Sequence, residues 1–289
     1  MERLRKQLQQ LAPAASPGLF VDFEELLAAD GVRLTGIPGI FAVVVEYVRY
    51  LLHVRGVDYT MAAPDRTDTA RLYEATRQES VPTLFVDGER PYNSWLEQTY
   101  KAAALGDGPS LIPASSEERV VMFGLMNEIQ GEGGLLFNKR FAMIPPEGAC
   151  AGSSPTQFLP HPTPVALAGN AFGEKYGWSP EAAAGAEDRI VEILGALDAQ
   201  LVKQQQSGSR FFIGAALTAL DVHWAAFSNM VAPGDASLLP HNNPHSMPLN
   251  VFAATNTPRI EAAITPLLLS HREFIYETYL GSGAPFPVE

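Results

Sequence analysis

A broadly apolar segment from Ile40 to Val54 restricts the fold more than any other feature of this sequence. Phe41, Val48 and Leu51 belong to a set of large apolar side chains that would cover most of the circumference of a helix. A surface helix needs a polar face, so a helix that is apolar almost all round is buried. We therefore expect a helix packed against a sheet and ended by Gly56.

Short strands and further helices surround this segment in a regular order. We expect a strand over 32–36, the helix over 40–54, a strand over 57–61, a helix over 69–78, strands over 81–86 and 89–92, and a helix over 94–105. The two last strands are joined by Asp87-Gly88, a strong hairpin-turn signal. A helical crossover followed by a hairpin is the order of an α/β thioredoxin-like fold.

The boundaries of the domains follow from this pattern. The thioredoxin-like domain is expected to span 31–106, behind an N-terminal extension over 1–30 in which Phe20, Phe23, Leu26 and Leu27 have helical spacing. Residues 114–289 predict an all-α helical-bundle domain that begins with a capping box at Ser115. Proline-rich stretches predict two long loops in it, near 145–180 and 233–258.

Composition argues against several classes of partner. The chain has 289 residues and a net charge of −12, and both nucleic acid and anionic membranes need clustered cations. The alternative interpretation is that the negative net charge only keeps the protein soluble. Cys150 is the single cysteine, so an intrachain disulfide is excluded and a reducing, cytoplasmic location is expected. We find no secretory signal, no membrane span and no metal-binding signature in the sequence.

The first motif with chemical meaning is Val81-Pro82, where a proline stands at the start of a strand. An X–Pro bond loses little free energy by being cis, unlike other peptide bonds. In this order of elements we expect a cis bond, which would turn the Val81 N–H and C=O outward. A peptide ligand can then pair with them as an added strand would. The alternative is an ordinary trans proline at a strand edge.

Two helix starts supply the other motifs. Asn93-Ser94 begins a helix eleven residues after Pro82. The free N–H groups and the positive dipole of a helix start bind carboxylates, although Ser94 can also serve only as a cap. Thr218 and Asp221 follow Phe212-Ile213-Gly214 and can cap a helix reciprocally. That second pair is expected to have a structural role.

With these three motifs the chain resembles the cytosolic glutathione transferase superfamily over about residues 32–232. The resemblance implies that glutathione is bound as a co-substrate by Val81, Pro82, Asn93 and Ser94, and that a small hydrophobic electrophile lies between the domains. It also implies a homodimer and a detoxifying transferase.

Further site residues are expected from the resemblance. Arg77 and Gln78 would reach a carboxylate or the γ-glutamyl group of glutathione, with a solvated helix end as the alternative. The hydrophobic substrate would be lined by Met122, Met126, Gln130 and Phe137, for each of which a place in the core is an equal alternative.

The sequence departs from the family where the thiol should be activated. Family members carry Tyr, Ser or Cys just after the first strand, and residues 35–41 contain none of these. The catalytic candidates are the Thr35 hydroxyl, which could instead face the core, and the backbone N–H groups of Gly36, Ile37 and Gly39.

Two functions therefore stay open. One is an enzyme that adds the glutathione thiolate to a hydrophobic electrophile, with ether cleavage or isomerisation as variants. The other is a non-catalytic binding or interaction protein with the same fold. Dithiol redox chemistry is excluded, because there is no Cys-x-x-Cys.

Overall fold

The computed structural model describes residues 20–37, 41–65, 68–142, 176–234 and 250–280. These residues divide into two compact units, each with its own core. The first unit contains residues 20–112, 234 and 274–280 within the described ranges, and the second contains residues 113–233 and 250–273. The α/β domain followed by an all-α domain, expected from the sequence, is confirmed.

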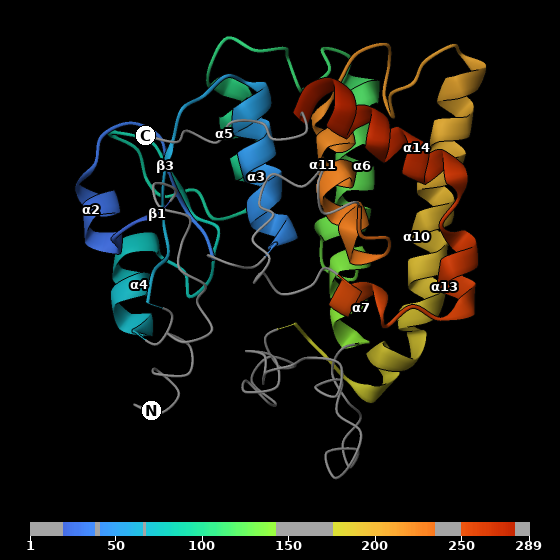
Figure 1. The fold of residues 1–289 in the computed structure, drawn as a ribbon, viewed down its shortest axis with the longest axis horizontal. Coiled ribbons are helices and arrows are strands. Elements are labelled where there is room, and N and C mark those ends of the chain that lie inside the picture. The colour runs from blue at the N-terminus through green and yellow to red at the C-terminus, as the bar shows by residue number, and fades with distance from the viewer. Residues whose placement is uncertain (1–19, 38–40, 66–67, 143–175, 235–249, 281–289) are drawn as a thin grey trace. The chain divides into compact units, whose positions relative to one another are not determined.

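A four-stranded sheet forms the centre of the first unit, in the order β1-β3-β2-β4 (Figure 1). Its strands are β1 (Phe20–Val21), β2 (Arg33–Thr35), β3 (Thr60–Ala62) and β4 (Leu84–Phe85). β1 and β2 both run parallel to β3, whereas β4 is antiparallel to β2 and places Leu84 opposite Leu34. The strand expected over 89–92 is reduced to an isolated bridge between Tyr92 and Leu84.

Helices cover both faces of this sheet. α3 (Val43–Val54) and α5 (Trp95–Ala104) lie on one face, and α2 (Phe23–Ala28) and α4 (Thr69–Thr76) lie on the other (Figure 1). α3 is buried on nearly every side, as its apolar circumference predicted, and Gly56 follows its end with a positive φ of 66°. The Tyr47 hydroxyl lies 2.7 Å from the Thr99 hydroxyl and so ties α3 to α5.

The fold begins earlier than the sequence indicated. Phe20 lies in β1, at the edge of the sheet, and not on the helix that its spacing suggested. Leu26 of α2 packs into a core cluster with Ala62 and Phe85. A strand of two residues is too short to show the alternation by which strands are recognised in a sequence, so the sequence carries no signal for β1.

Within the described residues, the regular elements of the second unit are all helices. It consists of α6 (Ser116–Gln130), α7 (Leu135–Phe141), α10 (Pro180–Gln206), α11 (Ala219–Phe227), η3 (Ser228–Met230), α12 (Asn250–Ala253), α13 (Pro258–Ala263) and most of α14 (Pro266–Ile275). α10 carries its apolar stripe inward, with Ile190, Leu194 and Leu197 buried. Parts of the two expected loops, 143–175 and 235–249, lie outside the described residues, while α12 stands within the second.

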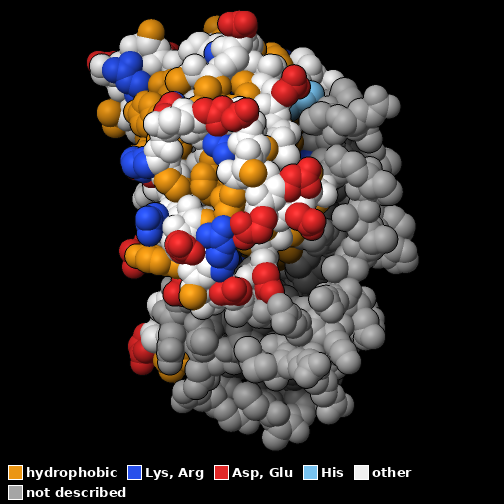
Figure 2. All heavy atoms as spheres, turned by 90° about the vertical axis from the view of Figure 1, so that its left-hand side faces the viewer, with side chains coloured by type: hydrophobic (Ala, Val, Ile, Leu, Met, Phe, Trp, Pro, Cys, Tyr) orange, Lys and Arg blue, Asp and Glu red, His pale blue; other side chains and the backbone are white. Residues whose placement is uncertain are grey.

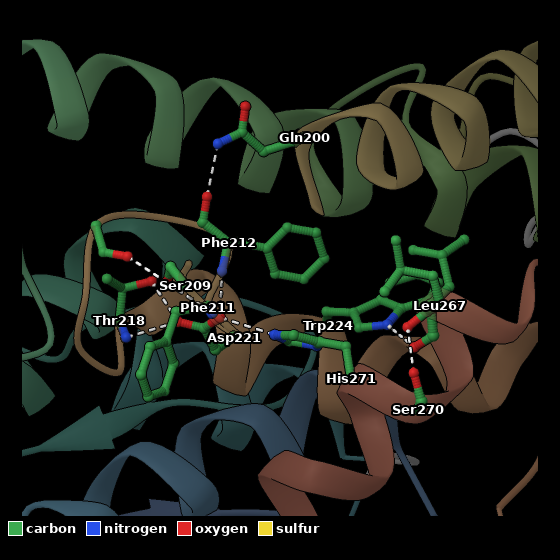
Figure 3. Close-up of polar contacts among 12 residues, drawn as sticks. Gln200, Ser209, Phe211, Phe212, Thr218, Asp221, Trp224, Leu267, Ser270 and His271 are labelled. Atoms are coloured by element: carbon green, nitrogen blue, oxygen red, sulfur yellow. Dashed lines mark hydrogen bonds and ion pairs between the residues drawn. The ribbon is translucent and has the colours of Figure 1, made fainter. Parts of the chain in front are cut away.

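Asp221 is the polar centre of the second unit (Figure 3). Its fully buried carboxylate accepts hydrogen bonds from the Phe212 N–H at 2.8 Å, the Thr218 N–H at 2.7 Å and the Thr218 hydroxyl at 2.8 Å. The Nε2 atom of His271, on α14, lies 2.9 Å from the same carboxylate. The reciprocal cap predicted for Thr218 and Asp221 is confirmed, and it also fixes α14.

The chain returns to the first unit at its last described helical segment. η4 (Tyr276–Leu280) contacts α3, where the hydroxyls of Tyr50 and Tyr276 lie 3.3 Å apart and their rings meet edge to face. Residues 274–280 therefore do not belong to the helical unit, although the sequence placed 114–289 in one domain. The boundary between the units at Phe274 leaves no signal in the sequence, because the apolar pattern of α14 continues through it.

Acidic and basic side chains are interspersed on the face drawn in Figure 2. The first unit pairs many of its charges: Arg71 lies 2.6 Å from Glu24, and Arg33 lies 2.9 Å from Asp87. In the part of the chain that the structure describes, that face shows no cluster of cations of the kind that nucleic acid requires.

Candidate functional site

The backbone at Val81 is available for pairing. The Val81–Pro82 bond is cis, as the sequence predicted. Among the hydrogen bonds of the described residues, none involves the Val81 N–H or C=O. Val81 is only partly buried and lies three residues before β4. An extended peptide can therefore form hydrogen bonds with both groups.

Ser94 is the N-cap residue of α5, but its side chain makes no cap hydrogen bond. The residue is exposed, and its hydroxyl has no partner within the described ranges. The Glu97 carboxylate accepts from the backbone N–H groups of Ser94 and Asn93; its pKa is lowered first by Arg90 and further by these two groups. The hydroxyl of Ser94 thus stays free to contact a ligand.

A network of buried and partly buried polar side chains holds the peptide unit between Pro82 and Thr83. The Pro82 carbonyl accepts hydrogen bonds from the side-chain amides of Gln78 at 2.8 Å and Gln98 at 2.9 Å. On the other side of the same peptide unit, the Thr83 N–H donates to the Thr35 hydroxyl at 2.7 Å. Three side chains from different elements therefore fix the residue that follows Val81.

Two residues expected to bind the ligand point instead into this network. The Asn93 amide nitrogen donates to the Thr76 carbonyl at 2.7 Å, and its oxygen accepts from the Thr83 hydroxyl at 3.0 Å. The Gln78 amide donates to the Pro82 carbonyl and also to the Thr83 hydroxyl at 2.7 Å. Asn93 and Gln78 therefore support the loop that presents Val81.

Arg77 ends α4 in the left-handed conformation, with a φ of 64°. This conformation costs a residue with a Cβ atom roughly 1–2 kcal/mol, and glycine or asparagine is usual there. Arg77 is exposed, and its guanidinium has no hydrogen bond or ion pair among the described residues. A cation that is both strained and unpaired can serve a ligand carboxylate.

Comparison with solved structures identifies the architecture. A glutathione S-transferase domain-containing protein from Marinobacter aquaeolei VT8 matches with a TM-score of 0.57 and 17% identity, over 87% of this chain and 99% of its own. Glutathione transferase Omega 3C from Trametes versicolor matches with a TM-score of 0.54 and 12% identity, over 92% and 93%. The glutathione S-transferase from Ascaris lumbricoides matches with a TM-score of 0.52 and 15% identity, over 88% of this chain and 94% of its own.

This chain has the glutathione transferase fold. No family model matches the sequence, and no curated protein matches it. Identities of 12–17% establish the fold alone, so function has to be argued from the site.

The residues expected to activate the thiol lie at the end of β2 in this glutathione transferase fold. The Thr35 side chain is fully buried, and its hydroxyl accepts the hydrogen bond from Thr83. The Gly36 N–H donates to the Ala62 carbonyl at 3.0 Å, within the sheet. Ile37 is partly buried, and Gly39 lies outside the described residues. The two groups at 35 and 36 are thus both engaged in holding strands together.

Substitution of Thr35 by valine should lower the free energy of unfolding by about 1–3 kcal/mol, because it leaves the buried Thr83 N–H without an acceptor. Valine has nearly the same shape, so the packing of β2 is conserved. Urea unfolding followed by circular dichroism measures the change. Thr35→Ser keeps the acceptor and should cost less than half as much; equal losses for the two variants would show that the hydrogen bond does not matter.

The four residues expected to line a hydrophobic substrate lie on α6 and α7. Met122 and Met126 are fully buried. Gln130 is partly buried, and its side-chain oxygen lies 2.8 Å from Nε2 of His223. The Phe137 ring packs edge to face on Tyr176, with 5.5 Å between the centroids. Complete burial favours the core alternative for the two methionines.

Thr83, Glu97 and Gln98 belong to the site and were missed in the sequence. Ser94 and Glu97 have the spacing of a capping box, which could have pointed to Glu97. No local signal distinguishes Gln98 or Thr83, because their partners lie 16 and 10 residues away in Pro82 and Asn93.

Two titratable groups with lowered pKa values belong to the second unit. Burial lowers the pKa of Lys139 on α7 to about 7, and its ammonium donates to Thr255 and Asn256 at 2.7 Å each. Burial also lowers the pKa of His223 to about 3. In the described ranges no group of three or more His, Cys, Asp or Glu side chains could hold a metal ion, and no helix there is both long and apolar enough to cross a membrane.

Proposed function

We propose that the protein is a glutathione transferase, which binds glutathione in its first unit and adds the thiolate to a small hydrophobic electrophile. The observation that carries the proposal is the pair of unused groups at Val81 and Ser94. Glutathione is a peptide with a carboxylate at each end. Its cysteinyl backbone can pair with Val81, and its γ-glutamyl carboxylate can accept from the Ser94 hydroxyl.

The start of α5 supports the carboxylate end of this ligand. The N–H groups of Leu96 and Glu97 have no helical partner and no hydrogen bond among the described residues. The Glu97 carboxylate, which lies at the same helix start, is neutralised by Arg90 at 2.6 Å. Arg77 stands four residues before Val81 and is exposed and unpaired in the described part of the chain. It is our candidate for binding the second carboxylate of glutathione.

Replacing Ser94 with alanine is expected to weaken glutathione binding by about 10- to 100-fold, since a hydrogen bond to a charged group contributes roughly 1.5–3 kcal/mol. The free energy of unfolding should change by less than about 0.5 kcal/mol, because the hydroxyl makes no cap hydrogen bond. Titration calorimetry gives the affinity and urea unfolding gives the stability.

Ser179 offers the matched control, because it caps α10 and does accept a hydrogen bond, from the Ala182 N–H at 3.1 Å. Ser179→Ala should lose about 1 kcal/mol of stability and keep its affinity for glutathione. An equal affinity for Ser94→Ala and the unsubstituted protein would remove the proposed site.

A specific observation favours the second function, a non-catalytic glutathione-binding protein. The Thr35 hydroxyl and the Gly36 N–H are both engaged within the sheet. The two functions differ in the pKa of the bound thiol, because catalysis needs the thiolate near neutral pH. Thiolate absorbance of bound glutathione, followed against pH, separates them: a lowered pKa supports the transferase, and an unshifted pKa with tight binding supports the binding protein.

The remaining parts of the proposal follow from the resemblance of the chain to glutathione transferases. We propose a cytoplasmic homodimer that acts on hydrophobic electrophiles, as in detoxification, without a metal and without nucleic acid or membrane as partner. Analytical ultracentrifugation tests the dimer directly.

A further inference from the structure

Gln98 occupies an unusual place on α5. It is a polar residue on the helix face that packs inward with Thr99 and Ala102, and only 2% of it is exposed. Its single amide nitrogen lies 2.9 Å from the Pro82 carbonyl, 2.9 Å from the Tyr92 carbonyl and 3.4 Å from the Asn93 carbonyl. One donor group therefore faces three backbone acceptors on two separate segments.

These acceptors adjoin the two groups that the proposed function uses. The Pro82 carbonyl belongs to the peptide unit that follows the Val81–Pro82 bond. The Asn93 carbonyl belongs to the peptide unit that contains the Ser94 N–H. Because Gln98 donates to both, its side chain links the segment that contains Val81 directly to the start of α5.

Chemistry supports a role for this residue beyond filling space. Burying an amide costs free energy unless its hydrogen bonds are satisfied, and methionine would fill the same volume without that requirement. Gln78 and Thr35 also hold the peptide unit between Pro82 and Thr83: Gln78 donates to its carbonyl, and Thr35 accepts from its N–H. Gln98 joins that unit to the Asn93 carbonyl, beside the hydrogen bond from the Thr83 hydroxyl to the Asn93 side chain.

We infer that Gln98 is a positioning residue, which holds the Val81 backbone and Ser94 at the spacing that lets one glutathione molecule engage both. This inference rests on the proposed function. A ligand held at two points binds tightly only while the distance between the points matches its own length. Without Gln98 each point persists, and the Thr83–Asn93 hydrogen bond and the Leu84–Tyr92 bridge still join the two segments, but the link from the Pro82 carbonyl to the Asn93 carbonyl is lost.

A double-mutant cycle on glutathione affinity tests the inference, using titration calorimetry on the full chain. Gln98→Met should weaken binding by about 10-fold, and Ser94→Ala should then have less than about one third of its effect in the unsubstituted protein. A residue that only stabilises the fold would leave the effect of Ser94→Ala the same in both backgrounds.

Gln200→Met is the matched control. Its amide also donates to a backbone carbonyl, that of Phe212 at 2.6 Å, but in the second unit. It should lower thermal stability and leave glutathione affinity unchanged. If Gln98→Met does not fold, Gln98→Asn, shorter by one methylene, replaces it in the same cycle.

The outcomes separate the two claims. Normal binding by Gln98→Met, or an undiminished effect of Ser94→Ala in that background, overturns the positioning role while the proposed function stands. Failure of the unsubstituted protein to bind glutathione overturns both.

Discussion

Replacement of Asp221 by alanine is expected to lower the free energy of unfolding by about 3–5 kcal/mol, among the largest effects of any single substitution in this chain. The carboxylate accepts from two backbone N–H groups and one hydroxyl and also contacts His271, and all of these groups are buried. Alanine leaves them without an acceptor, and each unpaired buried donor has a cost of its own. Urea unfolding followed by circular dichroism measures the loss.

Asp198→Ala is the control for Asp221. Its partly buried carboxylate accepts from the Thr265 hydroxyl, so removal should cost about 1 kcal/mol. A loss below about 1.5 kcal/mol for Asp221→Ala would contradict the central place given to this carboxylate, because it would match a single ordinary hydrogen bond.

Replacement of Arg49 by methionine is also expected to have a large effect, lowering the free energy of unfolding by about 3–5 kcal/mol at pH 7. Arg49 and Glu46 are 1% and 3% exposed, and Nη1 of Arg49 lies 3.3 Å from both oxygens of Glu46. Nε of Arg49 also donates to the Tyr59 hydroxyl at 3.0 Å. Without the guanidinium, the Glu46 carboxylate is buried with its nearest cation removed.

The loss should depend on pH in a defined direction. Burial raises the pKa of Glu46 even beside Arg49, and removing Arg49 raises it further. A carboxyl with a raised pKa in the folded state favours folding most when protonated, and this contribution is lost as the pH rises through the folded-state pKa. Arg49→Met should therefore regain stability relative to the unsubstituted protein between pH 7 and about pH 5.

Adding Glu46→Gln tests the cause. The double variant should recover most of the lost stability at pH 7 and should lose the relative gain on acidification, because no titrating carboxyl is left at that position. Urea unfolding at several pH values measures both. Parallel pH profiles for Arg49→Met and the unsubstituted protein would show that Glu46 is not the source of the loss.

The sequence predicted those parts of the fold whose signals are local. The apolar circumference of α3 identified that helix, with ends within three residues of those found. The Thr218–Asp221 cap was readable for the same reason, since its two residues stand three positions apart. His271 could not be joined to it, because 50 residues separate His271 from Asp221.

The site was predicted in outline and missed in its support. Val81 and Ser94 were recognisable because a proline and a helix start mark them. Gln98 and Thr83 carry no such mark, and their hydrogen bonds form only when β4 and α5 have come together. Asn93 was expected at the ligand for its position beside Ser94, but its amide bonds instead to Thr76 in α4 and to Thr83, the residue before β4.

The central claim is that glutathione is bound between the Val81 backbone and Ser94. An amide-resolved NMR titration of the isotope-labelled chain with glutathione tests it most directly. The claim predicts saturable shifts of the Val81 and Ser94 amide signals together, with one dissociation constant, while the signal of Ser179 stays in place. Saturable shifts elsewhere without any at Val81 and Ser94, or no shifts at millimolar glutathione, would contradict it.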